Sequence, residues 1–309
     1  MRIIFFGTPD FSVPSLTALQ ERHEVSLVVS QPDRPRNRGM TLSPPPVVKA
    51  ARALGIEMIF QPKLIKDPGS LTRIIAIEAD LLVTVAYGQL LPKALLHHPS
   101  IAAINLHASL LPRYRGAAPL QRVLMAGENE TGVSIIHMVP RMDAGDIIAS
   151  QAFPVDEAMD YGTLHDLTSK MGASLLLEVI TAIENGVSMR IRQDEAIASY
   201  ASRLQAEDCI ISWSDSAQAI HNRIRALSPL PGAETQLRGK RLKVLRSRVV
   251  ESLYEDLPGS LLENTSEGPC FVTGSDALLL LEVQPEGRKR VSAVSWFNGI
   301  RDSNLVLGR

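Results

Sequence analysis

The amino-acid sequence predicts an α/β protein, in which a doubly wound sheet is followed by a smaller all-β domain. Over the first 185 residues, apolar runs of strand length alternate with segments whose apolar residues recur at helical intervals. Beyond residue 206, short apolar runs recur at intervals of about ten residues, which is typical of a small β-barrel or sandwich. The length of 309 residues exceeds that of a typical single domain, so we expect two domains.

The elements of the first domain follow from its apolar runs. Strands are expected at 3–6, 25–29, 57–60, 81–85, 101–106 and 133–139. Helices are expected between them at 14–22, 47–54, 71–78, 93–97 and 120–126. The clearest helix covers 163–184, because apolar residues such as Leu164, Leu167 and Met171 recur there at three- and four-residue steps. The Asn185-Gly186 pair then ends it.

The second domain is predicted from a change of pattern. Residues 188–206 lose helical periodicity and become polar, so we expect a first domain over 1–187, a linker over 188–206 and a second domain over 207–309. In the second domain we expect a helix at 215–227 and strands at 242–245, 259–262, 269–272 and 277–283. A five-stranded barrel of the oligonucleotide-binding (OB) type fits this length, and a small sandwich is the alternative.

Composition narrows the class of protein. A hydrophobic content of 45% with 21% charged residues is typical of a globular protein. The widely separated Cys209 and Cys270 predict no disulfide framework and fit a reducing compartment. Met1 leads directly into an apolar strand, and no apolar run approaches membrane-spanning length, so we expect a cytoplasmic protein without a membrane partner.

The charged residues are unevenly distributed. A formal net charge of −1 argues against a globally basic nucleic-acid binder. Residues 238–248 nevertheless hold six basic side chains and no acidic one, and residues 31–49 hold four basic side chains against Asp33 alone. Such runs are often solvated surface, but local patches can attract phosphates whatever the total charge.

Two polar segments follow apolar strands and carry groups suited to acyl transfer. Asn105 and His107 alternate at the end of the run 101–106, so in an extended segment their side chains share a face. The segment from His137 to Asp146 follows the run 133–139 and contains Asp143. An amide and an imidazole can stabilise a developing oxyanion, while a carboxylate orients the imidazole and handles an amine's proton. These groups predict acyl transfer without a Ser or Cys nucleophile.

Other interpretations of these residues are weaker. Asn-x-His alone is often a strand-end cap or a histidine satisfied by hydrogen bonds. His107 and Asp143 lack a regular metal-ligand spacing and both cysteines lie far away in the sequence, so we expect no metal. The first turn, Gly7-Thr8-Pro9, is not G-x-G-x-x-G, and no G-x-x-x-x-G-K-[ST] occurs, which excludes dinucleotide and P-loop sites.

The two polar segments together resemble the folate-dependent formyltransferases. The resemblance is carried by N-L-H-A-S-L-L-P-R-Y-R-G-A-A-P from Asn105 to Pro119 and by the segment around Asp143. It extends along the whole chain to the members that act on methionyl-tRNA, through the segments 2–11, 31–35 with Arg38-Gly39, 85–89, 229–233 and 296–301. It implies a Rossmann-like, doubly wound N-terminal domain and a small OB-like C-terminal β-barrel that binds tRNA.

The resemblance also implies an activity and its partners. A formyl group would pass from the co-substrate 10-formyltetrahydrofolate to the amino group of methionyl initiator tRNA, giving N-formylmethionyl-tRNA for translation initiation. We therefore expect folate and initiator tRNA as partners, no metal, and a monomer in a bacterial-type cytoplasm. Asn105, His107 and Asp143 would be the catalytic residues.

Binding residues are carried over by position. The segment expected to contact folate is Ser109, Leu110, Leu111 and Pro112, and the loop expected to enclose the pterin holds Val85, Ala86, Tyr87, Gly88 and Leu90. An apolar slot with a polar rim suits a planar heterocycle, although either leucine could equally be core. The residues expected to contact tRNA are Arg34, Arg36 and Arg38 in the first basic segment and Lys240, Arg241 and Lys243 in the second.

Some positions depart from the family pattern, and other functions compete. Arg203-Leu204 replaces a usual Lys-Ile pair, and Ser228 and Leu230 replace the Asn and the aromatic residue of a turn. These departures concern tRNA contacts and leave the catalytic motifs intact. A single-domain glycinamide ribonucleotide formyltransferase would end near residue 200. Sugar-nucleotide N-formyltransferases share the Asn-His-Asp set and are the enzymatic alternative. A non-catalytic nucleic-acid-binding protein on an inactive scaffold would need none of the three.

Overall fold

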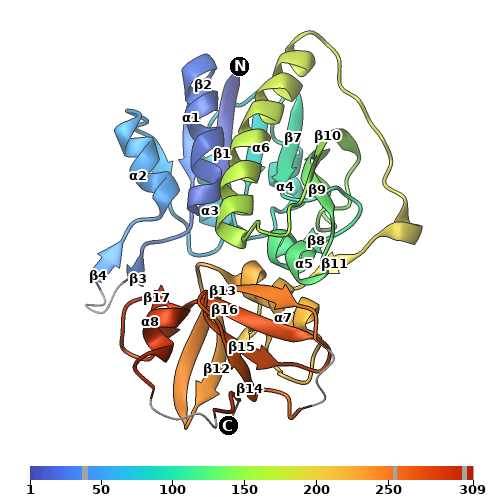
Figure 1. The fold of residues 1–309 in the computed structure, drawn as a ribbon. Coiled ribbons are helices and arrows are strands. Elements are labelled where there is room, and N and C mark those ends of the chain that lie inside the picture. Colours follow the sequence, from blue (N-terminus) through green and yellow to red (C-terminus); the bar gives the residue numbers. More distant parts are fainter. Residues whose placement is uncertain (37–40, 253–255, 301–304, 309) are drawn as a thin grey trace. The chain divides into compact units, whose positions relative to one another are not determined.

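Nearly continuous apolar runs form the central strands of the first sheet, as expected for strands that are buried on both faces. The computed structural model describes residues 1–36, 41–252, 256–300 and 305–308 (Figure 1). The sheet has the order β10-β9-β7-β6-β1-β2-β5. Its strands are β1 (Arg2–Gly7), β2 (Glu24–Val29), β5 (Ile59–Phe60), β6 (Leu81–Val85), β7 (Ala102–His107), β9 (Glu130–His137) and β10 (Ile147–Pro154). Strands β5, β2, β1, β6 and β7 are parallel, whereas β9 is antiparallel to β7 and β10 is antiparallel to β9.

Helices cover both faces of this sheet. They are α1 (Val13–Arg22), α2 (Pro46–Ala53), α3 (Pro68–Ile75), α4 (Lys93–Leu96) and α6 (Tyr161–Glu184). Figure 1 shows α1 and α6 in front of the sheet. Ile74 of α3 and Leu95 of α4 belong to the same core cluster as Ile4 of β1, whereas Gly172 of α6 packs against Leu106 of β7. Because side chains alternate along a strand, Asn105 and His107, on either side of Leu106 in β7, point away from α6.

The predicted strands of this sheet are confirmed, and other elements differ from the prediction. Helix α3 begins at Pro68 rather than at residue 71, because Asp67 caps it and accepts a hydrogen bond of 3.2 Å from the backbone nitrogen of Ser70. Strand β10 was not expected, and it pairs with β9 at the edge of the sheet. A short hairpin of β3 (Arg34–Arg36) and β4 (Thr41–Ser43) follows β2.

The chain forms two compact units that do not follow the predicted boundaries. Unit 1 comprises Met1–Pro119, Glu130–Pro154 and His165–Ser202; unit 2 comprises Leu120–Asn129, Val155–Leu164 and Arg203–Arg309. The segment with α5 (Pro119–Met125) belongs mainly to unit 2 because Arg122 donates to the Asp208 carboxylate at 2.7 and 2.8 Å. Most of the predicted linker instead belongs to unit 1, where Tyr200–Ala201 (β11) pairs with Arg115–Gly116 (β8).

Unit 2 is built on one antiparallel sheet. Its strands are β12 (Ala233–Leu237), β13 (Lys240–Val250), β14 (Leu261–Asn264), β15 (Pro269–Val272), β16 (Ala277–Pro285) and β17 (Val291–Ser292), with helices α7 (Ala217–Leu227) and α8 (Ala293–Phe297). Trp213, Ile220 of α7 and Phe271 of β15 lie in its core. The predicted all-β second domain is confirmed, and its sheet has six strands among the described residues rather than the five expected. The pairings of the described residues run as an open path from β12 to β14, with β17 beside β16.

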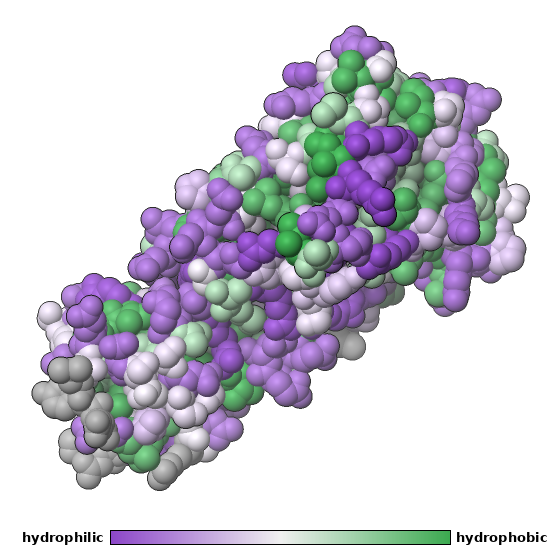
Figure 2. All heavy atoms as spheres, turned by 90° about the vertical axis from the view of Figure 1, so that its right-hand side faces the viewer, coloured by the Kyte–Doolittle hydropathy of each residue, from purple (hydrophilic) through white to green (hydrophobic). Residues whose placement is uncertain are grey.

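Short helices complete the chain: η1 (Asp10–Ser12), η2 (Glu195–Ile197) and η3 (Glu207–Cys209). Within the described ranges, no helix combines the length and apolar character needed to span a membrane. On the face shown in Figure 2, apolar residues are dispersed among hydrophilic ones.

Candidate active site

Four loops meet at the carboxyl edge of the parallel strands in unit 1. The loops after β6 and β7 are neighbours, since Val85 pairs with Leu106 at the ends of these strands. The turn after β1 reaches them through Thr8, whose hydroxyl donates to the backbone oxygen of Tyr87 at 2.9 Å. Gln31, after β2, donates to the same oxygen at 3.3 Å. Ligands in open α/β sheets bind beyond this edge, so the candidate site lies where the sequence predicts it.

Asn105 and His107 lie at the end of β7 on the face of the sheet that points away from α6. Their exposed fractions are 9% and 6%. Within the part of the chain that the structure describes, the Asn105 amide makes no hydrogen bond to protein and its atoms are not fully buried. Its N–H groups are therefore available to a ligand.

Asp143 reaches His107 from the loop after β9. Because β9 is antiparallel to β7, its carboxyl end lies beside the beginning of β7, where the Met138 nitrogen donates to the Ala103 oxygen at 2.8 Å. The loop between β9 and β10 nevertheless brings Oδ2 of Asp143 to 3.6 Å from Nδ1 of His107. The residues come together as the sequence predicts, but through this loop rather than through two aligned strand ends.

The same loop constrains Asp143 closely. Asp143 has φ of +50°, a left-handed conformation in which Asp and Asn are tolerated better than most residues. Its Oδ2 also accepts a hydrogen bond of 2.9 Å from the backbone nitrogen of Gly116. A Cβ atom at Gly145 would lie 1.7 Å from the backbone oxygen of His137, so only glycine fits there.

The His107 ring lies between two hydrogen-bond acceptors. Nε2 lies 2.9 Å from the backbone oxygen of Tyr114, and a carbonyl oxygen only accepts, so Nε2 donates. Nδ1 faces the Asp143 carboxylate. The ring orientation is therefore fixed from both sides, by a residue that also has a left-handed backbone (Tyr114, φ +60°) and by the β9–β10 loop.

The segment that follows His107 is a hydrogen-bonded turn. The Ser109 hydroxyl donates to the Arg113 oxygen at 2.7 Å, and the Ser134 hydroxyl donates to the Ser109 oxygen at 2.8 Å. Ser109 and Leu111 are buried, while Leu110 and Pro112 are half-buried. The Ser109 hydroxyl and the Leu111 side chain thus serve the turn and the core, and Leu110 and Pro112 keep accessible surface.

The loop after β6, which is the second segment predicted to contact folate, also contains both buried and exposed residues. The Val85 and Tyr87 side chains are buried, and the Tyr87 ring packs edge-on against Phe6 with centroids 5.3 Å apart. Burial raises the pKa of the Tyr87 hydroxyl well above its usual range, and this hydroxyl has no hydrogen-bond partner among the described residues. These two side chains therefore belong to the core, while their backbone lies in the loop expected to enclose the pterin, and that role of the loop stays a prediction. Ala86, Gly88 and Leu90 remain exposed in this loop.

The predicted tRNA-binding arginines fall in the β3–β4 hairpin. Arg34 begins β3 and is exposed. Arg36 ends β3, but its side chain lies outside the description, and Arg38 lies outside the described residues altogether.

The basic run of unit 2 is partly neutralised by a neighbouring strand. Lys240 and Arg241 are exposed and Lys243 is half-buried on β13. Glu234, on the paired strand β12, lies 3.4 Å from the Lys243 ammonium and 3.7 Å from the Arg241 guanidinium. Lys243 also donates to the Pro231 oxygen at 2.6 Å. The sequence shows six basic residues without an acid, whereas the fold supplies Glu234 and also Glu267, whose carboxylate lies 2.9 Å from the Arg248 guanidinium.

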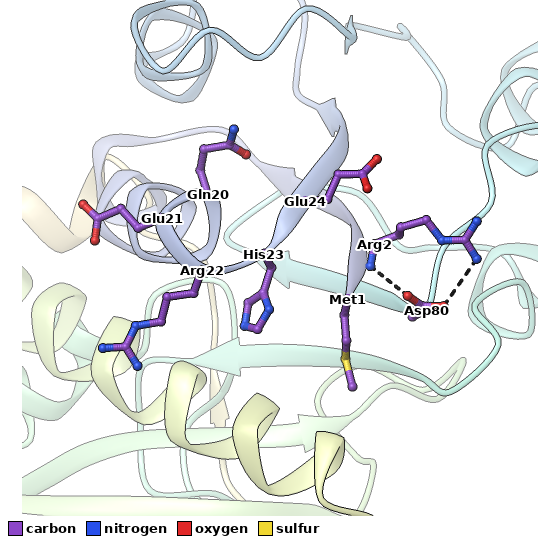
Figure 3. Close-up of a pocket in the computed structure, with 8 residues that line it drawn as sticks. All are labelled: Met1, Arg2, Gln20, Glu21, Arg22, His23, Glu24 and Asp80. Carbon is purple, nitrogen blue, oxygen red and sulfur yellow. Dashed lines mark hydrogen bonds and ion pairs between the residues drawn. The ribbon is translucent and has the colours of Figure 1, made fainter.

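A separate open hollow lies at the opposite edge of the sheet, where β1 and β2 begin (Figure 3). It is lined by Met1, Arg2, Gln20, Glu21, Arg22, His23, Glu24 and Asp80. Figure 3 shows Arg2 bonded to Asp80 through both its backbone and its guanidinium. This hollow is polar and holds none of the predicted site residues. No group of three or more potential metal-ligating side chains occurs in the described ranges.

Sequence reasoning missed the backbone partners of the site and a buried arginine. The Tyr114 oxygen and the Gly116 nitrogen leave no signal in residue types. Arg115 stands inside the motif after Asn105, yet nothing in the sequence indicates that Gln193, almost eighty residues later, contacts it.

Comparisons with known proteins identify the class. Residues 1–180 match the family model described as formyl transferase, and residues 203–301 match the one described as formyl transferase, C-terminal domain. With the doubly wound sheet and the separate antiparallel sheet, these matches define a formyltransferase.

Similar chains narrow the class. The chain is 44% identical over 303 residues to the methionyl-tRNA formyltransferase of Staphylococcus epidermidis, covering 98% of this chain and 97% of that protein. It is 43% identical over 300 residues to that of Bacillus licheniformis, covering 96% and 95%. The chain therefore belongs to the methionyl-tRNA formyltransferase family, and the resemblance stated from the sequence is confirmed.

Solved structures share the fold at low identity. An N-formyltransferase from Helicobacter canadensis, in complex with folinic acid and dTDP-3-aminofucose, has a TM-score of 0.68 at 17% identity, covering 90% of this chain and 98% of that one. HypX from Aquifex aeolicus, in complex with tetrahydrofolic acid, has a TM-score of 0.63 at 20% identity, covering 96% of this chain and 47% of that one. These likenesses concern the fold alone.

Proposed function

We propose that this chain transfers the formyl group of 10-formyltetrahydrofolate to the amino group of methionyl initiator tRNA, giving N-formylmethionyl-tRNA. The full-length similarity to methionyl-tRNA formyltransferases supports this substrate. The observation that carries the chemistry is His107, held between the Asp143 carboxylate and the Tyr114 oxygen beside an Asn105 amide that is available to a ligand.

The reaction needs no covalent enzyme intermediate. The amino nitrogen attacks the formyl carbon, a new C–N bond forms, and the carbonyl oxygen becomes an oxyanion. The amine loses a proton, and the tetrahedral intermediate then breaks its bond to N10 of the folate, which takes up a proton as it leaves. Free α-amino groups titrate at about 7.7–8.0, so a strong base is not required to expose the nucleophile.

Asn105 and His107 are the proposed oxyanion donors. The Asn105 amide can donate directly, because no protein acceptor occupies it in the described structure. The Nε2 proton of His107 is held by the neutral carbonyl of Tyr114 at 2.9 Å. An oxyanion accepts a stronger hydrogen bond than a neutral carbonyl does, so it can compete for this proton as charge develops.

Asp143 is the proposed acceptor of the proton that the amine loses. Its Oδ2 lies 3.6 Å from Nδ1 of His107, so the carboxylate stabilises positive charge on the ring. The amine's proton would pass to Asp143 through water and return to the departing nitrogen.

We propose that folate binds beside the loops after β6 and β7. The exposed Ala86, Gly88 and Leu90 and the half-buried Leu110 and Pro112 offer apolar surface near backbone groups. This is the combination that suits a planar heterocycle.

Initiator tRNA would meet the β3–β4 hairpin and the basic run of β13. Arg34 of the hairpin and Lys240 of β13 are both exposed. A-form RNA grooves hide base edges from side chains, so these contacts would be made by charge and shape. As an enzyme that supplies translation initiation, the protein would act in the cytoplasm, and we propose that it acts as a monomer.

One assay tests this function against the sugar-nucleotide alternative. The protein is incubated with 10-formyltetrahydrofolate and either methionyl initiator tRNA or a dTDP-linked amino sugar, and the N-formyl product is followed. We expect formylmethionyl-tRNA and no formyl sugar. Formylation of the sugar alone would replace the proposed substrate, and folate-dependent transfer to neither would refute the function.

A further inference from the structure

Arg115 is buried completely, although it carries a charge and lies three residues after the predicted folate segment. Nε and Nη2 donate to Oε1 of Gln193 at 3.1 and 2.8 Å. Nη1 and Nη2 donate to the Glu195 carboxylate at 3.2 and 2.9 Å. A buried charge is retained only when it is paired and hydrogen-bonded, and these two partners meet that need.

Gln193 connects Arg115 to the loop that holds Asp143. Its exposed fraction is 6%. Its amide nitrogen donates to the backbone oxygens of Asp143 at 2.8 Å and of Gly145 at 2.7 Å. The amide is therefore fully used: the oxygen accepts from Arg115, and the two N–H groups bind the loop on both sides of residue 144.

Asp143 needs such support because its backbone is strained. A left-handed φ of +50° costs energy for a non-glycine residue and persists only where the surroundings enforce it. The Arg115 side chain supports the backbone through Gln193, while the next residue, Gly116, binds the carboxylate through its nitrogen. Backbone and carboxylate of Asp143 are thus held from adjacent positions of β8, which in turn pairs with β11.

We propose that Arg115 and Gln193 are positioning residues, which hold the Asp143 carboxylate at His107 during formyl transfer. The inference rests on the proposed function, because it gives Asp143 a task in that reaction. It assigns a positioning role to the segment 188–202, which is most of the predicted linker 188–206. The purpose of the network is geometric: neither residue touches the reacting atoms.

Gln193→Glu separates positioning from folding. A glutamate keeps the oxygen that accepts from Arg115 but loses both N–H donors, so the link to Arg115 remains while the link to Asp143 and Gly145 is cut. Small misplacements of a catalytic group cost up to about a hundredfold in rate. We expect kcat to fall roughly 10- to 100-fold, with the KM for both substrates within about twofold. Arg115→Lys should act in the same direction, because a single ammonium cannot replace the planar fork.

The matched control is Gln151→Glu, the same chemical change at an exposed position of β10. Its kcat and KM should equal those of the wild type. A second readout does not depend on activity: the Gly116 amide, which Asp143 protects, should exchange its hydrogen faster in Gln193→Glu than in the wild type.

A double-mutant cycle decides between positioning and general stability. If Gln193 acts through Asp143, then Gln193→Glu should cost almost nothing further in an Asp143→Ala background. Equal losses in both backgrounds, or wild-type kcat with unchanged exchange at Gly116, would overturn the inference while leaving the proposed function intact. Absence of formyl transfer by the wild type would instead overturn the proposed function, and the exchange experiment would still report on the loop.

Discussion

At the scale of single residues, Asp143 combines three constraints. Its backbone is left-handed, its carboxylate accepts from Gly116, and the same oxygen faces His107. Asparagine can meet the first two constraints, because it tolerates the left-handed region and its side-chain oxygen can accept the hydrogen bond from Gly116. Substitution by asparagine therefore removes the charge with little disturbance of the loop.

We expect Asp143→Asn to lower kcat by roughly 10²–10⁴-fold, the range that a positioned proton-transfer group contributes. Steady-state formylation of methionyl-tRNA measures it. Asp166→Asn, an exposed change on α6, is the control and should leave kcat unaltered. Near wild-type turnover in folded Asp143→Asn would remove Asp143 from the chemistry.

One buried and two half-buried histidines predict how the stability of the protein depends on pH. Burial lowers the pKa of His23, His137 and His221 below the usual value. The unfolded chain, with histidine pKa near about 6.5, then binds more protons than the folded chain at mildly acidic pH. Stability should therefore be complete above about pH 6.5 and should decline as the pH falls toward the lowered pKa values.

His221→Gln should reduce this decline, since the half-buried His221 ring lies between the Ser247 hydroxyl and the Glu157 oxygen. Urea unfolding between about pH 7 and pH 5 measures the slope. Ser247→Ala, which removes a partner but keeps the imidazole, should lower stability at every pH and keep the slope. An identical slope in the wild type and His221→Gln would show that this ring does not contribute.

At the scale of elements, the β9–β10 loop decides where Asp143 lies. Its geometry depends on Gly145, where any Cβ would collide with the His137 backbone oxygen. Backbone atoms cannot yield as a side chain can, so the loop must shift.

We expect Gly145→Ala to lower the free energy of unfolding by about 1–3 kcal/mol and to lower kcat as well. Gly69→Ala, in the first turn of α3, is the control: it should leave kcat unchanged and should not lower the free energy of unfolding, since alanine suits a helix. Unaltered stability and kcat in Gly145→Ala would contradict the collision.

Elements with strong apolar patterns were predictable, and those held by long-range pairing were not. Strands β1, β6 and β7 follow from their apolar runs, and α6 follows from its periodicity. The short, polar β12 and β17 carry no comparable signal, and the segment 188–202 is ordered by hydrogen bonds to Arg115 and by pairing with β8. At the site, the side chains of Asn105, His107 and Asp143 could be named from the sequence. The Tyr114 oxygen and Gly116 nitrogen could not, because a backbone group has no residue type.

At the scale of the whole molecule, the balance of charge bears on tRNA. Glu234 offsets Arg241 and Lys243, so the basic run of β13 should contribute less to tRNA binding than its six charges suggest. Each phosphate contact contributes about one unit to the log–log slope of affinity against salt.

Replacing Lys240, Arg241 and Lys243 by alanine should weaken tRNA binding and flatten this slope by about one unit rather than three. Glu234→Gln should strengthen binding, because it frees two cations. Affinity titrations at several salt concentrations measure both effects. An unchanged slope in the triple variant would mean that the run is solvated surface alone.

The rate of a single turnover on methionyl initiator tRNA tests the central claim most directly. Wild type and Asn105→Ala are saturated with 10-formyltetrahydrofolate and tRNA, so that the measured rate reports the chemical step. Losing one oxyanion donor should lower that rate by about 10²–10³-fold while tRNA affinity and the free energy of unfolding stay unchanged. Asn185→Ala, at the exposed end of α6, should retain the full rate. A wild-type rate in Asn105→Ala would contradict the account, because the amide that it assigns to the oxyanion would then do nothing for the reaction.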